Sequence, residues 1–290
     1  MLRLSSPRTI KYIMEKYGFK FSKSLGQNFL IDDQVIEDIM EGADVGSEDC
    51  VLEVGPGIGV MTQALAERAE KVVSVEIDSS LLPVLDETLA PYDNVKIINS
   101  DILKIDLRQL IEEEFNGRRP KVVANLPYYV TTPIIMMFLE EGIPVTDIVV
   151  MVQKEVAERI VSAPGNKIYG ALSVAVQFYS EPSVIVKAPK GLFMPQPKVD
   201  SLVVRMKIRE TPKVDVKNRK LFFRVVKAAF GMRRKTLLNA LSAGLGISKD
   251  MVNEVMGACD IDPKRRGETL SIEEFGLLAD RFETKMETSL

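Results

Sequence analysis

The sequence predicts an α/β protein in which helices cover a parallel sheet, followed by a smaller all-helical region. Three observations support this prediction. Short runs rich in valine and isoleucine alternate with helical patterns through most of the chain, and a glycine-rich turn follows the first of them. After residue 210 the pattern becomes purely helical. Such alternation is typical of folds that bind ligands at the carboxyl ends of parallel strands.

The expected sheet contains short, bounded runs of residues that favour strands. These strands are Cys50–Val54, Val72–Ile77, Val95–Ile98, Val122–Ala124 and Ile148–Val152. The segments between them have apolar residues at helical spacing, and each is long enough to cross back over the sheet. These helices are Gly59–Ala69, Ser80–Leu89, Leu107–Phe115 and Thr132–Glu141.

A second group of elements completes the chain. The pattern first predicts helices at Lys154–Ser162 and Ala171–Tyr179, and strands at Val184–Lys187 and Leu202–Ile208. Helices alone then follow at Arg219–Phe230, Arg233–Ala243, Lys249–Ala258 and Ile272–Glu283. Ser271 and Glu274 have the spacing of a capping box before the last helix. We therefore predict a first domain at 1–210, with an N-terminal arm at 1–28, and a helical domain at 211–290.

The composition is that of an ordinary soluble protein. The chain has 290 residues, of which 46% are hydrophobic and 27% charged, enough to bury a large core. No run approaches the roughly 18 apolar residues of a membrane span, and no signal-peptide pattern begins the chain, so we expect a cytoplasmic protein without membrane contact. Cys50 and Cys259 match no metal spacing, and histidine is absent, so we expect no metal.

Basic residues are concentrated in two parts of a chain whose net charge is only −3. The segment from Val203 to Lys235 holds twelve lysine or arginine residues against Glu210 and Asp215, and the first 28 residues hold six against Glu15. This segregation is typical of a surface that faces phosphates. A solvated helix face is the alternative, so the charges alone do not establish nucleic-acid binding.

A glycine-rich turn, VLEVGPGIGVMTQAL, joins the first predicted strand to its helix. Gly55, Gly57 and Gly59 permit positive φ angles and a close approach of the backbone to a ligand. Val60 stands where the dinucleotide-binding pattern has its third glycine, so pyrophosphate binding is not favoured. A tight turn without a ligand is the alternative interpretation.

Two acidic residues follow the next strands at the same predicted edge. Glu76 ends the second strand, where a carboxylate can accept hydrogen bonds from both hydroxyls of a ribose. Asp101 follows the third strand, close to where an adenine amino group would lie. Either residue alone is more simply an ordinary loop acid. Together, beside the glycine turn, they predict a site for a nucleoside that carries no pyrophosphate.

These residues, in this order, resemble the motifs of S-adenosylmethionine-dependent methyltransferases with a Rossmann-like class I fold. The tetrapeptide Asn125-Leu126-Pro127-Tyr128 is similar to the motif of enzymes that methylate amino nitrogens of bases. The chain as a whole, from about Lys11 to the last helix, resembles the ribosomal RNA adenine N6-dimethyltransferases. This wider resemblance is carried by KSLGQNFL at 23–30, FMPQPKVDS at 193–201 and GMRRKTLLNAL at 231–241.

The resemblance implies a cofactor site formed by the arm and the strand ends. S-adenosylmethionine is the cofactor it implies. The residues expected to contact it are Gln27, Asn28, Leu30, Gly55, Gly57, Glu76, Ile77, Asp101, Ile102 and Asn125.

The resemblance also implies how an adenine amine is aligned for methylation. The side-chain carbonyl of Asn125 and the backbone carbonyl of Leu126 are expected to accept from the N6 hydrogens and to orient the nitrogen lone pair. Pro127 restricts the local backbone. Tyr128 and Phe193 are expected to hold the extruded base between aromatic faces, although core packing is the alternative for each ring.

The expected substrate is a pair of adjacent adenines in a hairpin near the 3′ end of small-subunit (16S) ribosomal RNA, converted to N6,N6-dimethyladenine. The partner is the immature small subunit, and we expect a monomer. Transfer of two methyl groups follows from the resemblance alone. The residues expected to contact RNA phosphates are Arg224, Lys227, Arg233, Arg234 and Lys235, with Lys20 and Lys23 in the arm.

Two other functions remain open from the residues. A non-catalytic assembly factor for the small subunit would carry the same motifs. A large-subunit methyltransferase of the macrolide-resistance type shares QNF and a similar tetrapeptide, although Leu25, Gly26 and Leu126 here favour the small-subunit enzymes.

Overall fold

The computed structural model describes residues 3–19, 21, 26–232 and 234–287 of the chain. Its internal contacts divide the chain into two units. The first unit comprises Met1–Ala157 and Pro182–Ile208, and the second comprises Glu158–Glu181 and Arg209–Leu290. The predicted boundary near residue 210 lies beside Arg209, but the segment Glu158–Glu181, which we placed in the first domain, groups with the second unit.

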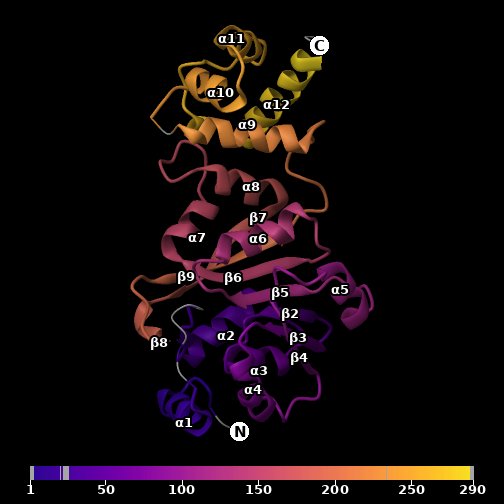
Figure 1. Ribbon diagram of the computed structural model, residues 1–290, viewed down its shortest axis with the longest axis vertical. Coiled ribbons are helices and arrows are strands. Elements are labelled where there is room, and N and C mark those ends of the chain that lie inside the picture. The colour runs from indigo at the N-terminus through magenta and orange to yellow at the C-terminus, as the bar shows by residue number, and fades with distance from the viewer. Residues whose placement is uncertain (1–2, 20, 22–25, 233, 288–290) are drawn as a thin grey trace. The chain divides into compact units, whose positions relative to one another are not determined.

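The first unit is organised around a seven-stranded sheet in the order β4-β3-β2-β5-β6-β9-β7 (Figure 1). Neighbouring strands from β4 to β6 are parallel, and β9 pairs with β6 in the antiparallel direction. The inner strands are buried along nearly their whole length, as expected for parallel strands covered on both faces. The strands are β2 (Cys50–Val54), β3 (Lys71–Glu76), β4 (Val95–Asn99), β5 (Lys121–Asn125), β6 (Asp147–Gln153), β7 (Ser180–Ala188) and β9 (Ser201–Ile208).

Helices follow most of these strands, as the alternating pattern predicts. Aspartate side chains begin two of them: Asp32 accepts from the Val35 N–H, and Asp106 accepts from the Arg108 and Gln109 N–H groups. The helices are α2 (Asp33–Gly42), α3 (Val60–Ala66), α4 (Leu82–Thr88), α5 (Leu107–Phe115), α6 (Thr131–Glu140) and α7 (Lys154–Ile160), with a short 3₁₀ turn, η1 (Ser79–Leu81), before α4.

The N-terminal arm is attached to the first unit through a helix and a short strand. Helix α1 (Pro7–Tyr17) buries Ile10 and Ile13, and Lys16 and Tyr17 bind Glu87 of α4. Strand β1 (Phe29–Leu30) then pairs with β8 (Phe193–Met194).

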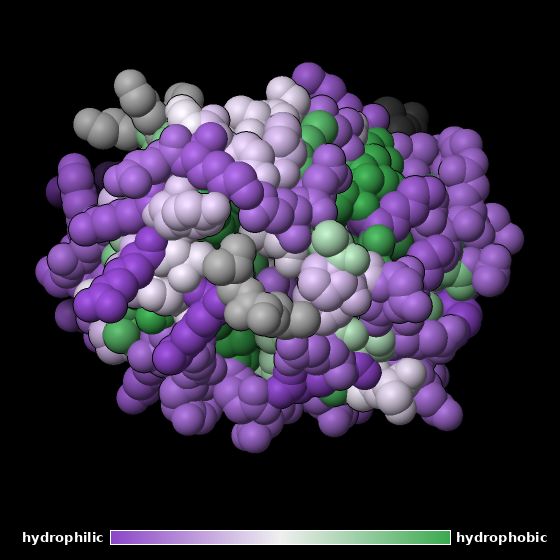
Figure 2. Space-filling view, turned by 90° about the horizontal axis from the view of Figure 1, so that it is seen from below, coloured by the Kyte–Doolittle hydropathy of each residue, from purple (hydrophilic) through white to green (hydrophobic). Residues whose placement is uncertain are grey.

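Figure 2 shows a largely hydrophilic face, seen from below, with its hydrophobic residues in small groups.

The second unit is helical and has its own hydrophobic core. Tyr169, Val174 and Phe178 pack in one cluster with Phe222 and other residues of the C-terminal helices. This burial explains why Glu158–Glu181 groups with the later helices. The helices are α8 (Ala171–Tyr179), α9 (Arg219–Gly231), α10 (Leu237–Leu245), α11 (Lys249–Ala258) and α12 (Ile272–Glu287), with η3 (Gly267–Thr269) before α12.

Two predictions about the second unit have different outcomes. The capping box is confirmed, since the Ser271 N–H donates to Glu274 and the Glu274 N–H donates to Ser271 Oγ. The predicted helix Arg233–Ala243 is wrong at its start, because α10 begins at Leu237. Its first N–H groups donate to carbonyls of a distant loop, at Pro263 and Arg265, and Arg234 and Lys235, which precede it, are not helical.

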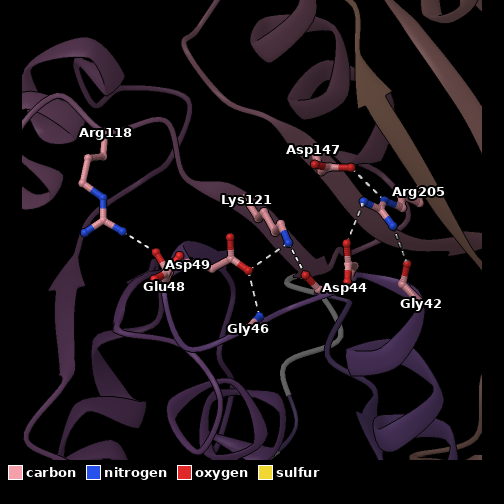
Figure 3. Close-up of polar contacts among 9 residues, drawn as sticks. All are labelled: Gly42, Asp44, Gly46, Glu48, Asp49, Arg118, Lys121, Asp147 and Arg205. Carbon is pink, nitrogen blue, oxygen red and sulfur yellow. Dashed lines mark hydrogen bonds and ion pairs between the residues drawn. The ribbon is translucent and has the colours of Figure 1, made fainter.

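A polar network lies at the amino ends of β2, β5 and β6 (Figure 3). The Arg205 guanidinium donates to Asp147 Oδ1 at 2.7 Å and to the Gly42 carbonyl at 3.2 Å. The Lys121 ammonium donates to Asp49 Oδ2 at 2.9 Å and to the Asp44 carbonyl. These contacts hold the loops at this edge of the sheet, opposite the carboxyl ends where a ligand site is predicted.

Replacing Asp147 with alanine is expected to lower the free energy of unfolding by about 2 kcal/mol, because it removes a buried carboxylate that binds Arg205, while the Gly42 carbonyl remains as an acceptor. Asp147 is only 4% exposed. Chemical denaturation measures the change, and Asp86→Ala, at an exposed position on α4, is the control. Binding of a ligand at the carboxyl edge should be unchanged. A loss of stability no larger than that of the control would contradict a structural role for the network.

Candidate active site

An open cleft of about 1130 Å³ lies at the carboxyl ends of β2, β3 and β5. That space includes solvent at the open side of the cleft. Every residue predicted to contact a cofactor lines it, together with Leu126, Pro127 and Tyr128. The cleft therefore brings together residues from the arm and from several strand ends. Among the described residues, no cluster of three or more cysteine, aspartate or glutamate side chains has the arrangement of a metal site.

The glycine turn forms one wall of the cleft. Its backbone has a conformation that residues with a side chain rarely adopt. Gly55, Gly57 and Gly59 have φ angles of 74°, 61° and 93°. A Cβ atom at Gly57 would lie 2.8 Å from a ring carbon of Phe29, so the arm packs directly on the turn. Glycine at this position thus allows both the backbone conformation and the close approach of β1.

Glu76 is held at the end of β3 by backbone hydrogen bonds. Its side chain accepts from the Gly57 N–H at 3.1 Å and from the Asp78 N–H at 2.8 Å. The residue is 4% exposed, and burial raises the pKa of its carboxyl, although the two N–H donors partly oppose that shift. Glu76 therefore connects the glycine turn to β3 and still has acceptor capacity on both oxygens.

The raised pKa of Glu76 predicts how nucleoside binding depends on pH. Ribose hydroxyls bind the ionised carboxylate best, so affinity should be constant at high pH and fall as the pH decreases through the raised pKa. The loss should therefore begin at a higher pH than for an ordinary glutamate, whose pKa is about 4.3. Calorimetry with S-adenosylhomocysteine between about pH 5 and pH 8 measures it. Glu76→Gln should bind more weakly without this pH dependence, and an equal slope in that variant would exclude Glu76 as the cause.

Asp101 and its neighbours lie at the next position along the same edge. Asp101 accepts from the Leu103 N–H at 3.1 Å and pairs with Lys104 at 3.5 Å. Its side chain is 26% exposed, so the carboxylate remains partly accessible. Ile102 is buried, whereas Ile77 and Leu103 expose apolar side chains in the cleft. This arrangement suits a purine, because the acid can accept hydrogen bonds from the polar edge of the base while the apolar side chains contact its flat faces.

Glu53 is a cleft residue that the sequence reasoning missed. It is fully buried in β2, and Oε2 accepts from Thr62 Oγ1 at 2.7 Å and from Ser74 Oγ at 2.6 Å. Burial raises its pKa to about 7. The signal in the sequence was a glutamate within the apolar run CVLEV. A buried strand tolerates an acidic side chain only when its carboxyl group has hydrogen-bond partners. Glu53 links β2 to α3 and β3 beneath the glycine turn.

Asn125 points into the cleft from the end of β5. Its Nδ2 donates to the Asn28 carbonyl at 3.1 Å, which leaves Oδ1 as the acceptor that this hydrogen bond does not use. Asn28 in turn donates to the Gly26 carbonyl at 2.8 Å. The arm thereby orients the Asn125 amide in the same cleft that Glu76 lines.

The aromatic residues near this amide have different environments. Tyr128 is half-buried, and its hydroxyl is hydrogen-bonded to Ser201 Oγ at 3.0 Å. Tyr129 also lines the cleft. Phe193 pairs with Leu30 in β8 and β1, is 4% exposed and packs in a hydrophobic cluster, so the structure does not bring its ring to the cleft wall. Its part in holding a base stays a prediction.

Comparison with known proteins identifies the family. The model of the ribosomal RNA adenine dimethylase family matches residues 18–278. The ribosomal RNA small subunit methyltransferase A of Alkaliphilus oremlandii is 58% identical over 287 residues, which are 99% of this chain and 100% of the relative. The protein of the same name from Clostridioides difficile is 55% identical over 99% of this chain and 100% of its own length. The chain belongs to the ribosomal RNA adenine dimethylase family.

Two solved structures share the fold of this chain. A dimethyladenosine transferase from Plasmodium falciparum has a TM-score of 0.75 at 23% identity, covering 89% of this chain and 98% of its own. The 23S rRNA methyltransferase ErmE has a TM-score of 0.69 at 25% identity, covering 88% and 99%. The predicted class I methyltransferase fold is therefore confirmed. Within the described residues, no helix has the length and apolar character needed to cross a membrane.

Four of the basic residues predicted to contact RNA lie on the surface of the second unit. Arg224 and Lys227 are exposed on α9, and Arg234 and Lys235 are exposed before α10. Lys20, Lys23 and Arg233 lie outside the described residues. The predicted positions therefore supply accessible positive charge where the structure describes them.

A second basic loop joins this surface, and the sequence reasoning missed it. The hydrogen bonds from Leu237 and Leu238 to the loop at 262–266 bring exposed Lys264 and Arg266 beside the start of α10. The signal was the run DPKRRGE at 262–268, whose three basic residues lie outside the two basic segments counted from the sequence.

Proposed function

We propose that this chain transfers methyl groups from S-adenosylmethionine to the N6 amino groups of adenines in small-subunit ribosomal RNA. The observation that carries the proposal is the shared cleft, in which the free amide oxygen of Asn125 lies with Glu76 and the glycine turn. The family and the closely related small-subunit methyltransferases support the choice of substrate.

The residues of the cleft fit S-adenosylmethionine as the methyl donor. Glu76 offers carboxylate oxygens to a ribose, and Asp101 lies where a purine edge would be bound. The glycine turn admits close approach at Gly55 and Gly57, and no phosphate site is required there. Asn28 and Leu30 of the arm also line the cleft, and Gln27 is anchored to Asp78 by a hydrogen bond of 2.8 Å. The bound cofactor supplies an electrophilic sulfonium methyl group.

Alignment of the adenine amine is the task of the chain's own residues. The lone pair of N6 is delocalised into the adenine ring. Hydrogen-bond acceptors for the amino hydrogens must therefore rotate the amino group until the lone pair points toward the methyl group. We assign the acceptance of these hydrogens to Asn125 Oδ1 and the Leu126 carbonyl, and the hydrogen bond from Asn125 Nδ2 to the Asn28 carbonyl supports this orientation of the amide. The methylated nitrogen is acidic and loses its proton to water, so no histidine is required.

A base that is stacked within RNA cannot reach such a cleft, so the target adenine must be turned out of its stack. Tyr128 is held by Ser201 and offers a fixed aromatic face beside Asn125. We propose Phe193 as a second face, which would have to leave its present packing to reach the base. For the second methylation, one remaining N6 hydrogen still has an acceptor at this site. Dimethylation of two adjacent adenines is proposed from the family.

RNA capture is assigned to the basic surface of the second unit and to the arm. Phosphate contacts there add affinity without base preference and make binding sensitive to salt. We assign these contacts to Arg224, Lys227, Arg234, Lys235, Lys264 and Arg266, and we extend the assignment to Lys20, Lys23 and Arg233 from the sequence.

Mass spectrometry of ribosomal RNA tests the whole proposal. Small subunits from a strain that lacks the modification are incubated with the purified monomeric chain and S-adenosylmethionine. We expect two adjacent adenines near the 3′ end of the small-subunit RNA to gain two methyl groups each. Methylation of large-subunit RNA instead would favour the resistance-type function, and no methylation would favour a non-catalytic assembly factor. Activity on immature but not on finished subunits would identify the cytoplasmic assembly intermediate as the partner.

A further inference from the structure

Tyr129 is an exposed aromatic residue at the cleft that neither the motif nor the proposed chemistry uses. Its side chain is 59% exposed, although it lines the same cleft as Asn125. Tyr128, which precedes it, is half-buried and tied to Ser201. The two adjacent rings therefore differ, because one is fixed in the wall and the other presents its surface to solvent.

The arm supports the Tyr129 ring from one side. A Cβ atom at Gly26 would lie 3.3 Å from Pro127 Cβ and 3.8 Å from Tyr129 Cδ1, so the arm backbone passes close to both. Gly26 also has a φ angle of 60°, which a side chain would strain. Glycine lets the arm lie against the ring edge without covering it.

The other exposed apolar residues of the cleft lie elsewhere along its edge. Ile77 follows β3 and Leu103 follows β4, beside the acids assigned to the nucleoside. Tyr129 follows β5, on the side of the acceptors assigned to the target amine. Its exposed ring thus lies at the part of the cleft assigned to the target adenine.

Turning one base out of a single-stranded loop removes a stacking partner from its neighbour, and this loss opposes base extrusion. Proteins that bind unpaired RNA compensate such losses by stacking bases on aromatic side chains. We propose that Tyr129 is a stacking platform for the base adjacent to the target adenine. This inference rests on the proposed function, which supplies the single-stranded RNA and its adjacent bases.

Steady-state kinetics with unmodified small subunits test the platform through four variants. Tyr129→Ala and Tyr129→Leu should raise KM for the subunit about 5- to 100-fold, the range expected for one aromatic stack, with a smaller effect on kcat. Tyr129→Phe keeps the ring and should stay within about twofold of the wild type. Val184→Ala removes a 39% exposed apolar side chain from β7, outside the cleft and the arm, and is the control.

Binding of S-adenosylhomocysteine, measured by calorimetry, should be the same in all these proteins. The platform is excluded if Tyr129→Ala leaves KM unchanged, if the phenylalanine variant loses as much as the alanine variant, or if leucine restores wild-type KM. Parallel losses of cofactor affinity would assign the ring to the cofactor wall instead. A wild-type protein that methylates no adenine would overturn the proposed function as well, whereas an active wild type with an unaffected Tyr129→Ala variant overturns this inference alone.

Discussion

Replacing Asn125 with alanine is expected to lower the rate of adenine methylation by about 100- to 1000-fold, the effect of removing one preorganised hydrogen-bonding group from a reaction centre. The variant loses Oδ1, the acceptor that the hydrogen bond from Nδ2 to Asn28 leaves available. The loss should fall mainly on kcat, because Oδ1 acts on the reacting amine, whereas Glu76 and the glycine turn still hold the methyl donor. Single-turnover transfer to unmodified small subunits measures it.

Two further variants separate alignment from fold. Asn253→Ala removes an exposed asparagine from α11 and should have wild-type activity and stability. Asn125→Asp keeps an oxygen acceptor for the amine, but its second oxygen faces the Asn28 carbonyl and repels it. This variant should therefore be more active than Asn125→Ala and less active than the wild type. Full activity in Asn125→Ala, with normal thermal unfolding, would remove Asn125 from the mechanism.

Replacing Gly57 with alanine is expected to weaken S-adenosylhomocysteine binding by about 10- to 100-fold. The new methyl group would lie 2.8 Å from the Phe29 ring, and φ at this position is 61°. Left-handed backbone at a residue with a side chain costs about 1–2 kcal/mol, so the turn must shift to relieve it. Such a shift displaces the Gly57 N–H that donates to Glu76 and thereby disturbs the ribose site.

Calorimetry measures the affinity of the Gly57→Ala variant, and circular dichroism follows its fold. Gly191→Ala is the matched control, because a Cβ there would meet open space and the backbone has no positive φ. Unchanged affinity in the Gly57 variant would show that the turn is only a connection between β2 and α3.

The strand ends and their side chains were predictable from local sequence patterns. Valine-rich runs identify β2, β3 and β5, and parallel strands bring their carboxyl ends to one edge. The position of Glu76 and Asn125 within one cleft follows from this geometry without any knowledge of side-chain contacts. The arm residues and the roles of the tetrapeptide, in contrast, came from resemblance to the family.

Contacts between distant segments were not predictable from the sequence. Pairing of β1 with β8 buries Phe193, and no local pattern reveals such a partner. Burial of Phe178 with Phe222 assigns Glu158–Glu181 to the second unit, although its helical pattern resembles that of the first. The start of α10 depends on carbonyls from the loop at 262–266.

The local sequence thus specified which residues stand at the ends of the strands, because strand periodicity and glycine conformations are short-range properties. Folding in three dimensions specified which faces remain open: the free oxygen of Asn125, the exposed ring of Tyr129 and the basic loop beside α10. These depend on hydrogen bonds and packing between residues far apart in the chain, whose energies no short window of sequence contains.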